Sequence, residues 1–401
     1  MNRFLFSKIL LHVVMIEFFF LSGEQHYTSF IVGGKSLVLF LGTCSLYFYT
    51  KRKNAIIRND NILTLLIIMA WVIASAFLWG QGHHDFFAGN YIFYPLAVLL
   101  LISASDFDKL RNLLLKYLVV LSAVSIVVQI GHDYFGIFPA STYFNALGNP
   151  HRLSLGLFST EWGEKRLSSI FWEPGQYQIV IYYILILFAD EWSDIKMWRK
   201  SLRKFGILII AILLTISTTA YIILLLIVFT IVIRNGNKHI ILYPIYIVSG
   251  LVISSYVIGS DAIQKKIAES DNDRSSYAIR LQDNIACWKV TMDDPLTGYG
   301  PGSDLLKRRL IRAGSETSSN GWLYGSAQLG IPYILFFWFC FWQKLRKMHK
   351  GIPVVFLLAA LILSQANEAT INCPYLYLYI FYYNKLPEIK KHRNRLLSIV
   401  R

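Results

Sequence analysis

Charged and aromatic side chains stand directly ahead of an apolar run in the stretch EKRLSSIFWEPGQYQ, at 164–178. An arginine such as Arg166 can bind phosphate oxygens through two parallel hydrogen bonds. The carboxylate of Glu173 can take a proton from a hydroxyl group. Pro174 suits the first turn of a helix, so Glu173 equally suits the N-cap, facing the positive end of the helix dipole. The sequence leaves both roles of Glu173, general base and helix cap, open.

Two further polar segments carry groups of the same kind. One runs from Arg274 through Arg280 to the stretch DDPLTGYGPG at 293–302, where Gly and Pro end a helical segment and force tight turns. The other, at 315–320, stands directly before an apolar run that begins at Gly321. The long segment 260–320 that contains both has nine Lys and Arg residues, which suit an anionic ligand such as a lipid phosphate.

The composition decides what kind of elements position these segments. The chain has 401 residues, of which 55% are hydrophobic and 16% charged, and its mean hydropathy is +0.47. These values exclude an ordinary soluble domain. Because the apolar residues come in runs long enough to cross most of a bilayer core, we expect one polytopic, all-α membrane domain over 1–401. The expected helices lie near 4–22, 29–50, 61–80, 91–105, 109–132, 175–189, 239–259, 321–342, 352–365 and 374–384.

The apolar stretch 205–233 sets the number of passes. A single helix of this length would exceed the bilayer core, and basic residues flank both of its ends. We therefore expect a short re-entrant segment or a two-helix hairpin that turns at 217–219. This gives about twelve passes with both termini in the cytoplasm, in agreement with the positive-inside rule. Two long loops, 133–174 and 260–320, then lie on the outer face, where function is expected.

Several other classes of function lack support in the sequence. The formal net charge is +15, but the basic residues form short clusters between apolar runs, which indicates membrane topology and no nucleic-acid partner. The four cysteines show no ligand spacing, so we expect no disulfide and no metal site. The sequence has no Walker loop, HExxH or GxSxG motif.

Four motifs in series resemble the O-antigen polymerase and O-antigen ligase superfamily. RLSSIFWEP at 166–174 resembles the segment R-x-S-G-x-F-x-E/N-P, and TISTTA at 215–220 is similar to the turn T-x-S-R. RLQD at 280–283, followed by PLTGYG at 295–300, resembles R-L-x-x…P-L-x-G-x-G. SNGWLYGSAQLG at 319–330 is similar to H-N-x-Y-L-x-x-x-x-E-L-G. The resemblance covers about 150–340.

The chain departs from these motifs at several positions. Thr218 stands where the family commonly has arginine, and Gln328 replaces a glutamate. Ser319 replaces the histidine that the ligase branch uses to activate the acceptor. The missing histidine favours the polymerase branch.

The resemblance implies a membrane glycosyltransferase (GT-C-like) without metal or cofactor. Its donor would be an undecaprenyl-diphosphate-linked oligosaccharide, its acceptor a second lipid-linked repeat unit, and its location the bacterial inner membrane with a periplasmic active site. A chain-length regulator protein and membrane lipid are further expected partners. The implied roles are catalytic for Glu173, Arg166 and Arg280, diphosphate-binding for Arg166, Arg280 and Arg274, and substrate-binding for Trp172, Tyr177, Tyr299, Ser319 and Asn320.

Three other interpretations remain beside this one. A ligase would transfer the glycan once to another acceptor. A flippase for lipid-linked oligosaccharide would also have about twelve passes, but its charges should line a cavity at mid-membrane depth. A receptor or scaffold without enzymatic activity is the third. Packing at the membrane interface explains the aromatic rings as well as sugar binding does.

Overall fold

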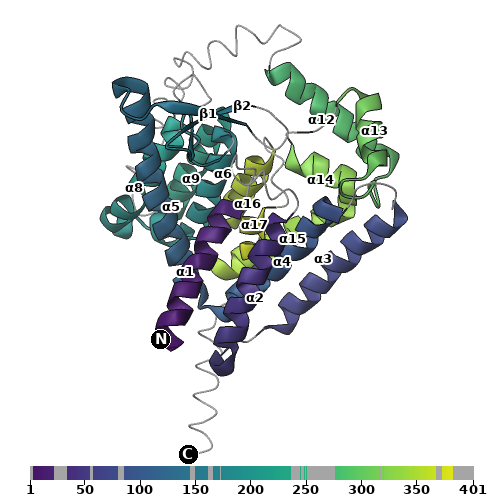
Figure 1. Ribbon diagram of the computed structural model, residues 1–401, viewed down its shortest axis with the longest axis horizontal. Coiled ribbons are helices and arrows are strands. Elements are labelled where there is room, and N and C mark those ends of the chain that lie inside the picture. The colour runs from purple at the N-terminus through teal and green to yellow at the C-terminus, as the bar shows by residue number, and fades with distance from the viewer. Residues whose placement is uncertain are drawn as a thin grey trace, which may run out of the picture.

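The protein is a bundle of helices with one small sheet (Figure 1). In the figure, α5, α6, α8 and α9 lie on one side, α3, α12 and α13 on the other, and α16 and α17 between them. The computed structural model describes the residues 3–21, 34–54, 57–79, 85–144, 150–160, 166–171, 173–235, 244, 248, 250, 276–315, 318, 320–366 and 373–382.

Five helices make up the first third of the chain and follow the predicted ones closely. The α2 helix packs along α4, α1 packs along α2, and α3 packs on α4. The α5 helix begins at a real cap, since the Asp106 side chain accepts the backbone N–H groups of Asp108 and Lys109. The bounds are α1 Arg3–Leu21, α2 Lys35–Asn54, α3 Asn59–Leu78, α4 Asp85–Ala104 and α5 Phe107–Ile130.

The first predicted loop contains a short antiparallel sheet, so the expectation of an all-α fold is wrong at this place. After the π-helical turn η2 (Gly131–Phe135), the strands β1 (Ala140–Phe144), β2 (Pro150–Ser154) and β3 (Phe158–Ser159) pair in the order β1-β2-β3. Thr, Tyr and Phe in β1 favour extended backbone. Helix periodicity does not detect strands this short, which explains the error.

The predicted interruption of 205–233 by a turn between two helices is confirmed, but the turn lies at 215–217 instead of 217–219. The α8 helix (Trp198–Leu214) ends and α9 (Thr218–Asn235) begins within three residues, and Ile216 between them has a positive φ of 46°. Before the hairpin come α6 (Pro174–Ile186), α7 (Ala189–Trp192) and the 3₁₀ turn η3 (Ile195–Met197). The predicted helix at 239–259 lies outside the described residues, apart from three isolated positions.

The last third of the chain differs from the prediction in one helix. The segment 321–342 was expected to be continuous, but Gly330 breaks it, with φ 83° and ψ 160°, and Pro332 follows in the first turn of the next helix. A residue with a Cβ would be strained at this φ. The described helices are α12 Ser276–Asp293, α13 Asp304–Ala313, α14 Gly321–Leu329, α15 Ile331–Met348, α16 Val354–Gln365 and α17 Pro374–Ile380.

Three of the described helices are long and apolar enough to cross a membrane by length and composition alone. They are Asn59–Leu78, Phe107–Phe135 and Thr218–Asn235. Two shorter apolar helices, Asn90–Ala104 and Val354–Gln365, accompany them. The chain is therefore a membrane protein, while the number of twelve passes stays a prediction.

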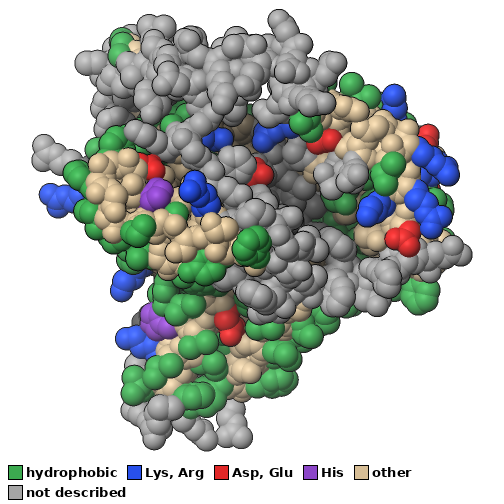
Figure 2. Space-filling model, turned by 45° about the horizontal axis from the view of Figure 1, so that its top comes forward, with side chains coloured by type: hydrophobic (Ala, Val, Ile, Leu, Met, Phe, Trp, Pro, Cys, Tyr) green, Lys and Arg blue, Asp and Glu red, His purple; other side chains and the backbone are tan. Residues whose placement is uncertain are grey.

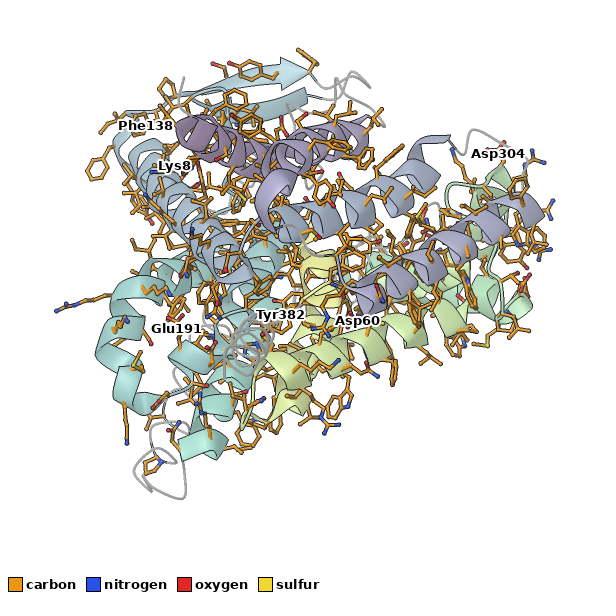
Figure 3. All side chains as sticks on the ribbon, turned by 90° about the horizontal axis from the view of Figure 1, so that it is seen from below. Lys8, Asp60, Phe138, Glu191, Asp304 and Tyr382 are labelled. Atoms are coloured by element: carbon orange, nitrogen blue, oxygen red, sulfur yellow. The ribbon has the colours of Figure 1, made fainter. Side chains whose placement is uncertain are left out.

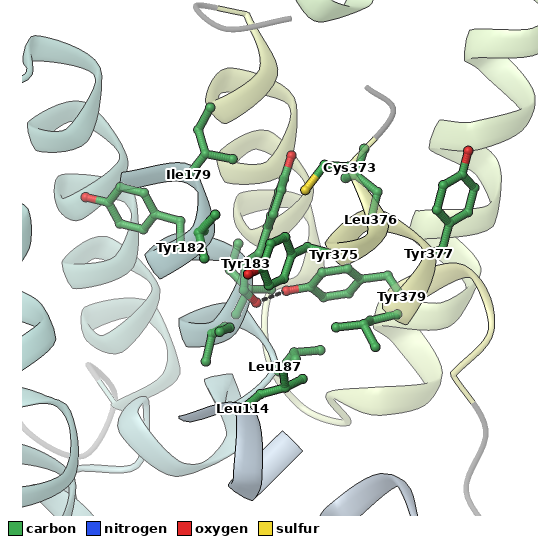
Figure 4. Close-up of a cluster of buried hydrophobic side chains, with 14 of the residues drawn as sticks. Leu114, Ile179, Tyr182, Tyr183, Leu187, Cys373, Tyr375, Leu376, Tyr377 and Tyr379 are labelled. Carbon is green, nitrogen blue, oxygen red and sulfur yellow. Dashed lines mark hydrogen bonds between the residues drawn. The ribbon is translucent and has the colours of Figure 1, made fainter. Parts of the chain in front are cut away.

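The core of the protein is built around α6 and α17, which are apolar on all sides. Every residue of α17 is buried, and so is nearly every residue of α6. Their tyrosines bring hydroxyl groups inside, and neighbouring helices satisfy several of them. Tyr379 donates to the carbonyl oxygen of Tyr183 (Figure 4), and Tyr182 donates to that of Ala220. Interhelical bonds of this kind fix the helices against one another.

A buried lysine joins α15 to the ends of α3 and α17. The Nζ of Lys344 donates to Asn61 Oδ1 at 2.8 Å and to the carbonyl oxygen of Tyr382 at 3.3 Å. It also lies 3.8 Å from the carboxylate of Asp60. Asp60 and Tyr382 lie near each other in Figure 3. These bonds compensate the burial of the charge.

Candidate functional site

The guanidinium of Arg166 lies at the end of α8, where the helical hairpin turns. Its Nε donates to the carbonyl oxygen of Thr215 at 3.1 Å. The next residue strengthens the same join, because the N–H of Leu167 donates to the carbonyl oxygen of Leu214 at 2.9 Å. The last carbonyl groups of a helix carry partial negative charge, so a cation is stabilised there. Arg166 is therefore fixed to the turn that the sequence placed in a separate motif.

The residues after Arg166 are held from two further sides. Ser169 donates or accepts a 2.6 Å hydrogen bond with Ser125 of α5. Its carbonyl oxygen accepts the N–H of Ser159 in β3 at 2.8 Å. Ser169 has a positive φ of 59°, and it occupies the position where the resembling motif has glycine. A left-handed residue held by its surroundings is strained, which is typical of functional segments.

Glu173 occupies the N-cap position of α6, but its side chain makes no capping hydrogen bond. Its carbonyl oxygen accepts the N–H of Tyr177 at 3.2 Å, and Pro174 stands in the first turn as predicted. The side chain is partly exposed. The backbone thus confirms that α6 starts after Glu173, while the carboxylate of Glu173 does not cap the helix. Its role as general base stays a prediction.

The aromatic residues of this segment lie in different places. Tyr177 is fully buried, donates to Ser122 Oγ at 2.6 Å, and stacks on Phe171 with ring centroids 5.7 Å apart. This packing does not favour the predicted contact of Tyr177 with substrate. Trp172, the other predicted sugar contact here, lies outside the described residues.

Arg280 lies on the face of α12 that is turned toward the protein. Helical spacing places Asp283 and Cys287 on the same face, one and two turns further on. Asp283 accepts the hydroxyl of Ser315 at 2.5 Å, and Gln282 donates to the carbonyl oxygen of Gly314 at 2.6 Å. The two bonds tie the first half of α12 to the segment that leads into α14. Arg274 lies outside the described residues.

The thiol of Cys287 is protonated at neutral pH. Burial raises the pKa of Cys287 to about 11, against a smaller opposite effect of the hydrogen bond with Ser318. A thiol with this pKa is a poor nucleophile. Cys287 is thus a packing residue behind Arg280.

Asn320 caps α14. Its side-chain oxygen accepts the backbone N–H groups of Trp322 and Leu323, each at 3.1 Å. Its own N–H donates to Ser318 Oγ at 3.0 Å. This use of the side chain gives Asn320 a structural role beside the predicted contact with substrate. Ser319, the residue in the histidine position, lies outside the described residues.

The glycine motif at 295–300 interlocks with the break between α14 and α15. The N–H groups of Tyr299 and Gly300 donate to Ala327 and Gln328 at 2.9 and 2.8 Å. A Cβ on Gly298 would lie 2.5 Å from the carbonyl carbon of Gln328, and one on Gly330 would overlap the carbonyl oxygen of Leu296. The two motifs thus need glycine because their backbones touch.

Tyr299 lies inside this interlock. Only 3% of it is exposed, its ring is 5.2 Å from that of Trp79, and the guanidinium of Arg309 lies 4.8 Å from its centroid. Arg309 in turn pairs with Asp293 at 2.9 Å. This position favours packing over the predicted contact with substrate, which stays untested.

The two arginine segments are linked through the middle of the bundle. Trp322 of α14 donates to the carbonyl oxygen of Ile362 in α16 at 2.8 Å, and Gln365 of α16 bonds with Tyr183 of α6. In Figure 2, Lys, Arg, Asp and Glu side chains gather near the middle of the face between the two sides. No group of three His, Cys, Asp or Glu side chains within the described ranges is placed to hold a metal.

Sequence reasoning missed the residues that position the arginines. Thr215 and Leu214 hold Arg166 through backbone carbonyl groups, and a carbonyl group carries no signal in the sequence. Ser125 and the pair Asp283 and Ser315 act through contacts between distant segments. One signal was available: Ser169 stands where the resembling motif has glycine, and a glycine position can indicate a left-handed backbone.

The comparisons with known proteins agree with the resemblance seen in the motifs. Residues 205–337, about a third of the chain, match the family model described as O-antigen ligase. The match is consistent with the O-antigen polymerase and ligase superfamily, whose members are membrane glycosyltransferase-like enzymes. The matched segment contains Arg280, Tyr299 and Asn320, while Arg166 and Glu173 precede it. No curated protein and no solved structure matches the chain.

Proposed function

From the O-antigen ligase domain at 205–337, we propose that the protein polymerises lipid-linked oligosaccharide repeat units into O-antigen or a related surface polysaccharide. The match supports polymerase-type or ligase-type activity. The donor in this proposal is an undecaprenyl-diphosphate-linked glycan and the acceptor a second such unit. The reaction takes place on the periplasmic side of the inner membrane.

One observation supports including the first loop, with Arg166, in the same active site. Arg166 lies outside the matched segment, but it is bonded to Thr215, and its neighbour to Leu214, both inside that segment. The turn between α8 and α9 and the first loop are therefore one structural unit. An arginine fixed in this way can meet an anionic group without first having to be ordered.

The chemistry follows from the groups at hand. The bond between the sugar anomeric carbon and the diphosphate oxygen breaks, and the diphosphate leaves with both electrons. Arg166 and Arg280 stabilise the negative charge that develops on it, with Arg274 as a further contact. The acceptor hydroxyl forms the new glycosidic bond and gives its proton to Glu173. The proposal requires no metal or cofactor.

Polymerase and ligase activities differ in the acceptor. Ser319 stands where the ligase branch has histidine, which favours polymerisation. Ligation to another acceptor is the second candidate, since the matching family model is described as O-antigen ligase. A chain-length regulator would be a partner of the polymerase.

The test uses the full-length protein in vesicles with a fluorescent lipid-linked repeat unit. Polymerase activity gives a ladder of products on a gel. One product band that requires a separate acceptor indicates a ligase. Movement of the substrate across the membrane without a new product would refute both and indicate a flippase.

A further inference from the structure

The α12 helix carries an apolar stripe on the side turned away from its buried residues Cys287 and Val290. Leu281, Ile285, Trp288 and Met292 follow one another at spacings of four, three and four residues. This spacing places them along one side of a helix. Each is between 42% and 51% exposed. We call these four residues the α12 stripe.

The rest of α12 is used for packing. Ala286, Cys287 and Val290 are buried on the other side of the helix, which contacts α13 and α14. The helix thus has a protein side that carries the candidate arginine and an outer side that is apolar. Large side chains exposed in a row, with a tryptophan among them, mark an interaction surface.

The stripe continues an apolar surface at the end of a candidate membrane span. Phe77 and Leu78, the last two residues of α3, are 85% and 63% exposed. The next residue, Trp79, lies against the loop that follows α12, with its Nε1 3.4 Å from Thr297 Oγ1. In that loop Leu296 is 66% exposed. The end of α12 therefore lies close to the end of α3, and α12 runs across the direction of α3 in Figure 1.

Basic side chains accompany the stripe. Lys289 is exposed on α12 beside it. On the neighbouring α13, Lys307, Arg308 and Arg312 are exposed, and Figure 2 shows a gathering of Lys and Arg over this side of the molecule. Such side chains reach phosphate groups while an apolar face is buried in acyl chains.

We propose that the α12 stripe lies in the interface of a phospholipid bilayer, with the basic residues of α12 and α13 at the lipid phosphates. An amphipathic helix in this position buries its apolar face about 5–10 Å into the boundary between headgroups and acyl chains. Tryptophan is enriched at this depth. The continuity with α3 and the basic neighbours favour lipid over a second copy of the chain or another protein.

The test measures the depth of Trp288 in the full-length protein. The protein is reconstituted into phospholipid vesicles whose acyl chains are brominated near the headgroup, because bromine quenches tryptophan by contact. The Trp288→Phe variant keeps the apolar volume, and the difference between wild type and variant isolates the emission of Trp288. We expect that emission to fall by about half or more. Trp322, which is 5% exposed and isolated in the same way with Trp322→Phe, should be quenched much less.

Two results would overturn the proposal. Quenching of Trp288 by iodide in the water, but not by brominated lipid, would place the stripe in solvent. Protection from both quenchers would mean that protein covers it. If Trp288→Phe does not fold, wild-type protein is photolabelled with a phospholipid that carries a diazirine in its acyl chain. Trypsin then releases residues 281–289, which should carry the lipid; an unlabelled 281–289 beside labelled α3 would contradict the inference.

Discussion

The segments that carry Arg166 and Arg280 are held in different ways. The Arg166 segment is fixed by backbone bonds to the hairpin of α8 and α9 and by a strained Ser169. The Arg280 segment is an amphipathic helix that side chains tie to Gly314 and Ser315, at the end of α13. The first precedes the matched segment but is bonded to its hairpin, and the second is a surface helix inside the matched segment with a few polar ties. We infer that the first sets the position of the diphosphate and that the second can adjust to lipid and glycan.

The largest expected effect tests whether both segments serve one reaction. Arg166→Ala and Arg280→Ala should each lower the rate of polymer formation by about 100-fold or more, because each removes a donor to the leaving group. Lysine should not restore either activity, since it cannot make the bidentate contact. The measurement is the initial rate of ladder formation, with protein in the membrane quantified beside it. Loss of activity in only one of the two variants would show that the two segments do not serve the same reaction.

Glu173→Gln tests whether the carboxylate in the Arg166 segment is the general base. The carboxylate makes no capping bond, so the substitution should leave thermal stability unchanged. Loss of the proton acceptor should lower the rate by about 100-fold. Unfolding temperature and rate are measured on the same preparation. Full activity of Glu173→Gln would exclude the general base.

Gly330→Ala tests the interlock that supports the Arg280 side. The added Cβ would meet the backbone of Leu296 at a positive φ, so we expect a loss of about 1–3 kcal/mol in the free energy of unfolding. Gly206→Ala is the matched control, because no atom lies within 4 Å of its Cβ. In the α8 helix this change should be neutral or slightly stabilising. Equal stability of the two variants would contradict the interlock.

A smaller effect is expected from the tie between α12 and Ser315, which follows α13. Asp283→Ala and Ser315→Ala should be coupled by about 0.5–1.5 kcal/mol in a double-mutant cycle of unfolding. Both single variants should also raise KM more than they lower kcat, because Arg280 would be less well positioned. Additive effects would show that the hydrogen bond does not hold the helix.

The smallest effect concerns Asn320. Replacement by alanine should cost about 1 kcal/mol of stability through the lost cap of α14, and Asn320→Asp should restore it. Retained activity in Asn320→Asp would assign the residue to the cap. Loss of activity in a stable Asn320→Asp protein would instead support the predicted contact with substrate.

The sequence was sufficient for the features that depend on local pattern. The apolar runs located most of the described helices, and basic residues around 205–233 revealed the hairpin. Pro174 marked the start of α6. The break at Gly330 was missed, because the reason for it is the backbone of Leu296, a residue that is distant in the sequence.

The candidate site was predictable in its residues but not in its geometry. Arg166, Glu173 and Arg280 stand out as charged groups in an apolar chain. Their positions depend on Thr215, Ser125 and Ser315, which have ordinary residue types and act through contacts over 30 to 50 residues of sequence or through backbone atoms. The ring chemistry of Tyr177 and Tyr299 suggested contact with a ligand, and burial of both rings could not be foreseen from the sequence; their contact with substrate stays a prediction.

The measurement that tests the central claim most directly is the binding of the leaving group. Undecaprenyl diphosphate and undecaprenyl monophosphate are titrated against the wild-type protein and against Arg166→Ala and Arg280→Ala in vesicles. If both arginines meet the diphosphate, the wild type binds the diphosphate more tightly than the monophosphate, and each variant loses most of this preference. An unchanged preference in both variants would contradict the account.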